Sequence, residues 1–172
     1  MDRKYADFAA QEAVRLLDID SPTGYTEAAA EWVKNEFSAL GFEAHTTAKG
    51  GVLVNLGGED ETDALLLEAH TDTLGAMVAE IKGSGRLRLT NLGGMRAENA
   101  EAENLRIRTR SGKVFEGTCQ LVNASVHVNG SYADTKRSFD TVEAVIDEDV
   151  KSADDVRALG IEVGYIVCFE PR

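Results

Sequence analysis

Cysteine is scarce in this sequence of 172 residues. Cys119 and Cys168 are the two cysteines, they lie far apart, and they form no CxxC pair. Their number and spacing therefore argue against a zinc knuckle and against a disulfide-rich scaffold. We expect two buried thiols that remain reduced.

Long hydrophobic runs are also missing. No stretch approaches the ~18 continuous apolar residues that a membrane-spanning helix needs. The N-terminal sequence MDRKYAD contains no apolar segment of the kind found in a secretory signal. Hydrophobic residues still make up 43% of the chain, enough for one substantial core or two small ones. We expect a soluble globular protein of the cytoplasm with no membrane partner.

Basic residues are in the minority, with 18 lysines and arginines against 30 aspartates and glutamates, and the formal net charge is -12. A charge of this sign disfavours polyanionic partners, so we expect no binding to nucleic acid. Four arginines, Arg86, Arg88, Arg106 and Arg108, alternate with leucine and isoleucine but have no aromatic residues between them. This pattern favours the solvated outer face of a barrel over a nucleic-acid stripe.

The first third of the chain changes from a helical to an extended pattern. Apolar residues recur every three or four positions over residues 5–18, which predicts an amphipathic helix. A second helix is expected from a cap at Thr26 to a C-terminal Gly41. Short strands are then expected at 42–46 and 52–56, on either side of a glycine turn. This order is typical of one half of an α/β sheet domain.

Residues 65–75, LLLEAHTDTLG, are the most informative stretch. An apolar run that ends in His-x-Asp and a glycine predicts a buried strand with two polar side chains at its C-terminal end, where α/β sheets bind ligands. If the backbone stays extended, His70 and Asp72 project to the same side. A neutral imidazole can bind a metal through one nitrogen while a carboxylate fixes the other. A strand-end histidine with an aspartate that opens a turn is the alternative.

After Gly75 the sequence becomes rich in short alternating segments separated by glycine turns, which predicts a β-rich domain. Residues 119–140 are the least periodic part and are expected to form a long exposed excursion. Ser152 with Asp155 three positions later predicts a short helix, followed by a strand within 161–169. The remaining histidines, His45 and His127, have no partners at ligand spacing, so we interpret them as structural.

Taken in order, these pieces resemble the M42 family of metallo-aminopeptidases, the glutamyl and tetrahedral aminopeptidase group. The resemblance runs from end to end and is carried by residues 21–24 (SPTG), 70–78 (HTDTLGAMV), 92–94 (LGG) and 159–164 (LGIEVG). It implies an α/β fold in which half of an aminopeptidase-type catalytic sheet domain is interrupted by an inserted β-barrel-like assembly domain. The implied division is 1–75 catalytic, 76–164 inserted, and 165–172 a return strand toward the catalytic domain.

The resemblance also implies an activity: a di-metal aminopeptidase, with zinc or cobalt, that hydrolyses N-terminal residues from peptides and self-assembles through the inserted domain. His70 matches a metal ligand, and Asp72 matches the catalytic carboxylate that orients its imidazole. The family's other ligands and its general base have no counterpart before Arg172, so we expect the 172 residues alone to be inactive. Tyr165 also stands where the family commonly has aspartate. An M20-type carboxypeptidase or deacylase and a non-catalytic assembly module are the alternatives.

Overall fold

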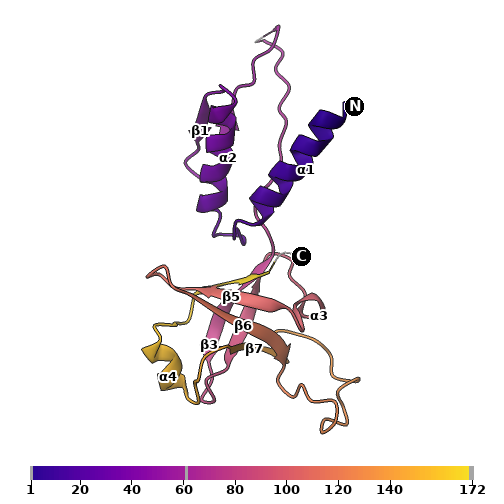
Figure 1. Ribbon diagram of the computed structural model, residues 1–172, viewed down its shortest axis with the longest axis vertical. Coiled ribbons are helices and arrows are strands. Elements are labelled where there is room, and N and C mark those ends of the chain that lie inside the picture. Colours follow the sequence, from indigo (N-terminus) through magenta and orange to yellow (C-terminus); the bar gives the residue numbers. More distant parts are fainter. Residues whose placement is uncertain (1, 61, 171–172) are drawn as a thin grey trace. The chain divides into compact units, whose positions relative to one another are not determined.

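The computed structural model describes residues 2–60 and 62–170, which divide into two compact units between Thr73 and Leu74 (Figure 1). The elements in chain order are α1 (Arg3–Leu17), α2 (Glu27–Ala39), β1 (Ala44–Thr46), β2 (Val52–Val54), β3 (Gly75–Ile81), β4 (Leu87–Leu92), α3 (Ala97–Ala100), β5 (Asn104–Arg108), β6 (Val114–Leu121), β7 (Val142–Ile146), α4 (Ala153–Ala158) and β8 (Ile166–Phe169). The mixed α/β class expected from the sequence is therefore observed, with a β-barrel in the second unit.

The first unit contains two helices and a hairpin. Asp2 caps α1 by accepting a hydrogen bond from the backbone N–H of Lys4 at 3.2 Å. α2 begins after Thr26 as expected, but the Thr26 side chain makes no capping hydrogen bond because its backbone does not adopt an extended N-cap conformation. Gly41 has a φ of +91° and ends the helix in the left-handed conformation that glycine favours. β1 and β2 then pair antiparallel, which confirms the expected hairpin.

The prediction of a buried strand at 65–69 is wrong. The segment forms no strand, and Leu65, Leu66 and Leu67 are 85%, 73% and 75% exposed. A β-strand requires a neighbour to accept and donate its backbone hydrogen bonds. The two-stranded sheet of this unit consists of β1 and β2 and does not include these residues. The apolar run thus remains unpaired and exposed within the described part of the first unit.

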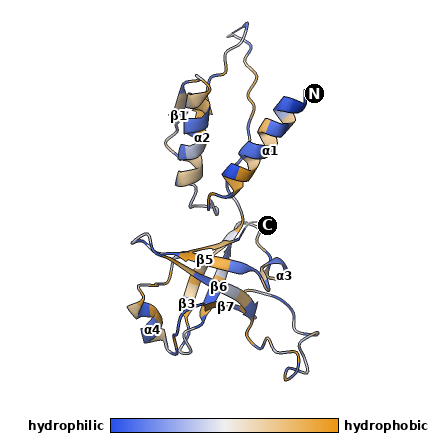
Figure 2. Cartoon of the chain, in the orientation of Figure 1, coloured by the Kyte–Doolittle hydropathy of each residue, from blue (hydrophilic) through white to orange (hydrophobic). Residues whose placement is uncertain are grey.

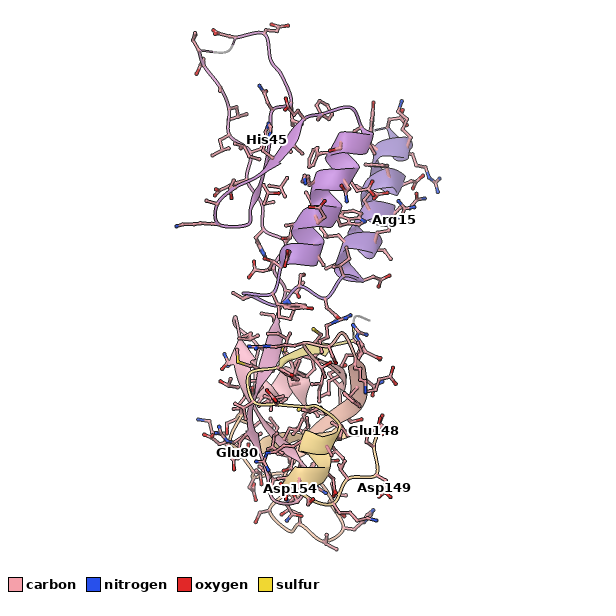
Figure 3. The ribbon with its side chains drawn as sticks, turned by 90° about the vertical axis from the view of Figure 1, so that its left-hand side faces the viewer. Arg15, His45, Glu80, Glu148, Asp149 and Asp154 are labelled. Carbon is pink, nitrogen blue, oxygen red and sulfur yellow. The ribbon has the colours of Figure 1, made fainter. Side chains whose placement is uncertain are left out.

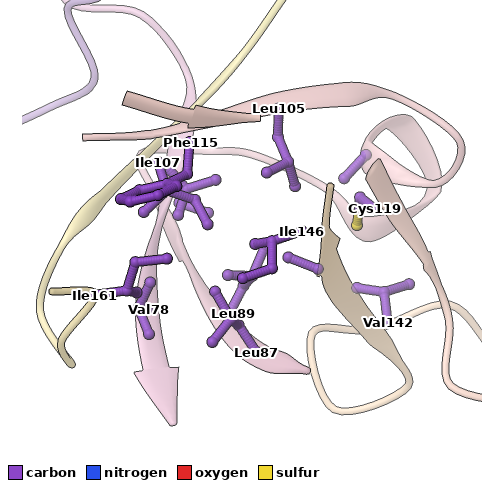
Figure 4. Packing of buried hydrophobic residues seen from close by; sticks show 14 of the residues in the cluster. Val78, Leu87, Leu89, Leu105, Ile107, Phe115, Cys119, Val142, Ile146 and Ile161 are labelled. Atoms are coloured by element: carbon purple, nitrogen blue, oxygen red, sulfur yellow. The ribbon is translucent and has the colours of Figure 1, made fainter. Parts of the chain in front are cut away.

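The second unit is a closed barrel with the strand order β3-β4-β7-β6-β5-β8. All its strand pairs are antiparallel. On β5, hydrophobic and hydrophilic residues alternate because successive side chains point into and out of the barrel (Figure 2). The core contains the following buried side chains, among others (Figure 4): Val78, Leu87, Leu89, Leu105, Ile107, Phe115, Cys119, Val142, Ile146 and Ile161.

A return strand toward the catalytic domain is expected at 165–172, of which residues 171–172 lie outside the described part of the chain. β8 pairs with β3 on one side and with β5 on the other, so residues 166–169 close the barrel. Closure removes two open sheet edges, which would otherwise expose unpaired backbone groups. Val167 on β8 belongs to the barrel core, and its neighbour Cys168 is also buried.

Both cysteines are free and buried, as expected. Burial raises the pKa of the Cys119 thiol to about 12, and the negative charges of Glu101 and Glu143 add to this effect.

Glu143 is almost fully buried on β7, where Lys82 donates to one carboxylate oxygen at 2.9 Å and Arg86 donates to the other. Arg86 is therefore not simply part of a solvated outer face, because its guanidinium compensates a buried charge.

A polar cluster fixes the long excursion between β6 and β7 onto the barrel. Arg137 Nε and Nη2 donate to the two carboxylate oxygens of Glu101 at 2.7 Å and 3.2 Å, and the Tyr132 hydroxyl donates to the same carboxylate at 3.0 Å. Arg137 also donates to the backbone carbonyls of Tyr132 and Thr135. These hydrogen bonds hold the pKa of Glu101 below its ordinary value, with those from Arg137 contributing most.

Replacing Glu101 with glutamine is expected to lower the free energy of unfolding by about 1–3 kcal/mol at pH 7, since charge-assisted hydrogen bonds are lost. A carboxyl whose folded pKa is depressed stabilises the protein above its unfolded pKa, and this contribution disappears as the pH falls through the folded pKa. The difference between wild type and Glu101→Gln should therefore shrink in acid. Urea unfolding from pH 7 to about pH 3 measures it, with exposed Glu98→Gln as the control. A difference that does not change with pH would contradict the prediction.

Candidate functional site

The candidate site lies in the first unit, where two segments about fifty residues apart in sequence meet. Pro22 and Thr73 form a parallel β-bridge. Thr73 N–H donates to the Ser21 carbonyl at 2.8 Å, and Thr23 N–H donates to the Thr73 carbonyl at 3.2 Å. The buried Ser21 hydroxyl adds a bond of 2.9 Å to the carbonyl of Thr71. These contacts fix the backbone on both sides of Asp72.

His70 and Asp72 lie within hydrogen-bonding distance of each other, although the strand expected to present them does not form. His70 Nδ1 lies 3.1 Å from Asp72 Oδ1 and also 3.1 Å from the Asp72 carbonyl oxygen. A carbonyl and a carboxylate oxygen accept hydrogen bonds, so Nδ1 must carry the hydrogen in this geometry. In the neutral imidazole the lone pair then belongs to Nε2. The His70 side chain is 85% exposed, so this lone pair is accessible to a ligand.

The second oxygen of the Asp72 carboxylate also has a partner. Thr23 Oγ1 donates to Asp72 Oδ2 at 2.7 Å. This hydrogen bond contributes most to holding the pKa of Asp72 below its ordinary value, and His70 lowers it further through its charge and its hydrogen bond. Asp72 is thus ionised at neutral pH and accepts one hydrogen bond on each oxygen. Sequence reasoning placed Thr23 in a shared motif but assigned it no role, because its contact with Asp72 spans 49 residues.

His70 has the chemistry of one ligand of a divalent metal, and Asp72 has that of its orienting partner. An imidazole whose Nδ1–H is held by a carboxylate and whose Nε2 is free has the chemistry of a metal-binding histidine and its orienting partner. Within the described residues, no cluster of three or more histidine, cysteine, aspartate or glutamate side chains could hold a metal ion. Among the described residues, this site therefore has one imidazole with its orienting carboxylate, which is fewer ligands than a zinc site uses.

The other histidines and the acidic run at 147–149 lie on other elements of the chain. His45 lies on β1 (Figure 3), where its exposed Nε2 is 3.5 Å from Glu43 Oε1. His127 is exposed in the excursion between β6 and β7. The acidic run that includes Glu148 and Asp149 is in the second unit (Figure 3).

Similar proteins give the context of this geometry. The family model of the M42 glutamyl aminopeptidases matches residues 50–172. A protein of Bacillus subtilis (strain 168), named "Putative aminopeptidase YhfE", is 39% identical over 157 residues. The match covers 91% of this chain and 45% of the Bacillus protein, so the chain spans about half the length of this relative.

Solved structures show the same fold. An aminopeptidase from the archaeon Desulfurococcus kamchatkensis superimposes with a TM-score of 0.76 at 22% identity, over 91% of this chain and 41% of that one. The TET1 peptidase of Pyrococcus horikoshii is described as able to assemble into a tetrahedron or a large octahedral shell. It superimposes with a TM-score of 0.72 at 20% identity, over 95% of this chain and 47% of the TET1 chain. Together with the family match over most of its length, this establishes that the chain belongs to the M42 glutamyl aminopeptidase family.

Proposed function

We propose that this chain forms part of a metal-dependent aminopeptidase that removes N-terminal residues from peptides. The observation that carries the proposal is the His70–Asp72 pair, in which the carboxylate holds Nδ1–H and leaves Nε2 accessible. The family match supplies the reaction class. In this proposal residues 1–75 belong to the catalytic α/β domain, and the barrel is the inserted assembly domain.

His70 is the proposed metal ligand, and Asp72 positions it. Two divalent ions, zinc or cobalt, would polarise the scissile carbonyl and lower the pKa of a bound water. Asp72 fixes the imidazole orientation and makes Nε2 a better donor, because its negative charge stabilises the positive charge that develops on the ring.

The remaining ligands are proposed to come from outside residues 1–172. A catalytic zinc ion takes about three protein ligands, and the described residues hold no cluster of that size. The exposed leucines at 65–67 also support the proposal that further segments complete this domain. Burial of one exposed leucine side chain stabilises a structure by roughly 1.5–3 kcal/mol, so packing of an added strand or helix against these leucines would be favourable. We propose that such segments, supplied from outside these residues, complete the catalytic sheet.

The proposed partners are a peptide substrate and further copies of the chain. Self-assembly is described for the Pyrococcus TET1 peptidase, whose fold this chain shares. The barrel is the proposed contact region because it folds as a compact unit of its own. None of the helices in the described structure is long and apolar enough to cross a membrane. A cytoplasmic location is part of the proposal.

An assay with amino-acid p-nitroanilides tests this function. Residues 1–172 alone are expected to show no turnover with added zinc or cobalt, because they supply too few ligands. The polypeptide expressed with the coding sequence that follows them in the gene is expected to be active, and a chelator should abolish its activity. Metal-dependent turnover by residues 1–172 would contradict the ligand count. An inactive longer polypeptide would favour a non-catalytic assembly module instead.

A further inference from the structure

We infer that Thr23 is a positioning residue for His70. Its hydroxyl holds the Asp72 carboxylate in the orientation that keeps the hydrogen on His70 Nδ1, and this keeps the Nε2 lone pair available. The metal that Nε2 would bind rests on the proposed function, whereas control of the His70 tautomer by Thr23 does not.

Three side chains form a continuous hydrogen-bonded chain. Thr23 Oγ1 donates to Asp72 Oδ2 at 2.7 Å, and His70 Nδ1 donates to Asp72 Oδ1 at 3.1 Å. Each carboxylate oxygen therefore has one donor. The Thr23 hydroxyl must be the donor in its bond because an ionised carboxylate only accepts. With Oδ2 held by Thr23, rotation of the carboxylate would break this bond as well as the bond to His70.

The position of the Thr23 hydroxyl is set by the backbone. Thr23 N–H donates to the Thr73 carbonyl and Thr73 N–H donates to the Ser21 carbonyl, so the residue after Asp72 is joined directly to Thr23 and Ser21. The β-branched side chain of Thr23 also has few accessible rotamers. The hydroxyl is thus delivered to Asp72 by a fixed segment, which is what a positioning role requires.

Without this hydroxyl, the His70 ring would be held less firmly. Asp72 is 38% exposed and His70 is 85% exposed, so water competes for both side chains. The Asp72 carbonyl also accepts from Nδ1, which means that part of the preference for the Nδ1–H tautomer remains. The expected consequence is a partial shift toward the Nε2–H tautomer, the form that an unconstrained imidazole favours.

Nitrogen NMR of the 172-residue chain measures this directly. The chain has three histidines, and a His70→Gln variant identifies the His70 ring signals. Spectra are recorded at about pH 8.5, where an ordinary imidazole is neutral. Thr23→Val is expected to raise the Nε2–H to Nδ1–H ratio of His70 by roughly threefold to tenfold, the shift expected from losing one hydrogen bond. Thr23→Ser should restore the wild-type ratio, and Thr46→Val on exposed β1 is the matched control.

Hydrogen exchange of the backbone distinguishes a positioning role of Thr23 from a role in folding alone. Slow hydrogen exchange at Thr73 N–H reports whether the bridge to Ser21 is intact in each variant. If valine weakens the bridge, Thr23→Ala repeats the test without branched methyl groups. An unchanged tautomer ratio in an intact Thr23→Val or Thr23→Ala variant would overturn the inference, as would a failure of serine to restore the ratio.

The same samples separate this inference from the proposed function. Zinc ion added to the wild-type chain should shift the His70 Nε2 signal if Nε2 is a metal ligand. A tautomer that depends on Thr23 in a chain that does not respond to zinc would support the positioning role and count against the metal role.

Discussion

Replacing His70 with alanine is expected to abolish the proposed metal-dependent aminopeptidase activity of a polypeptide that contains residues 1–172 together with the segments that complete the site. The described residues offer no cluster of alternative ligands that could take the place of its Nε2. Loss of a ligand's hydrogen-bond partner typically costs 10–100-fold in metal affinity or activity, so loss of the ligand itself should cost more than about 100-fold. Asp72→Asn should fall within that range of 10–100-fold, because the imidazole stays while its negatively charged partner is removed.

His45→Ala is the matched control for this prediction. His45 is an exposed histidine in the same unit, and its nearest charged partner is Glu43 at 3.5 Å. Its replacement should leave activity unchanged. Bound metal, measured after dialysis, should fall in His70→Ala in proportion to activity. If His70→Ala kept its activity or Asp72→Asn lost more than His70→Ala, the assigned roles would be wrong.

Replacing Leu105 with alanine is expected to lower the free energy of unfolding of the barrel by about 2–5 kcal/mol. Leu105 is 1% exposed on β5, between strands β6 and β8, and points into the closed core (Figure 4). Truncation removes apolar contacts and leaves a cavity that a closed barrel cannot easily collapse to fill. Hydrogen exchange at the Ile107 amide measures the effect in the barrel separately from the first unit.

Val163→Ala supplies the comparison for Leu105→Ala. Val163 lies in the turn before β8 and is 59% exposed, so truncation should change the stability by no more than about 0.5 kcal/mol. Equal losses for the two variants would mean that the barrel core does not carry the stability of the second unit.

Much of the barrel was predictable because its signals are local. Leu105 and Ile107 alternate with Arg106 and Arg108, and this period of two matches the observed inward and outward directions on β5. Ser152 caps α4 by accepting from Asp155 N–H at 3.2 Å, as its spacing predicts. The short helix α3 was missed, since four residues carry too little periodic pattern to be recognised.

Longer-range pairing was not predictable in the same way. The apolar residues 65–69 have the composition of a buried strand, but composition does not supply a neighbouring strand, and the structure leaves them exposed. β8 pairs with β3 and β5 and so satisfies the edges of both, but no local pattern within residues 166–169 specifies these partners. A residue pattern reports which face of a segment is apolar, but not which partner covers it.

The candidate site combines both kinds of information. The sequence by itself placed His70 and Asp72 two residues apart, a spacing at which side chains share a face if the backbone is extended. The two side chains meet in the structure although residues 65–72 form no strand. The sequence also determined, through the order of its motifs, the family to which the chain belongs. Only the tertiary structure decided that Thr23 holds the second oxygen of Asp72, since that contact spans 49 residues and depends on the bridge between Pro22 and Thr73. The physical reason is that short-range geometry follows from the backbone, whereas a contact across the chain forms only where packing and backbone hydrogen bonds bring two segments together.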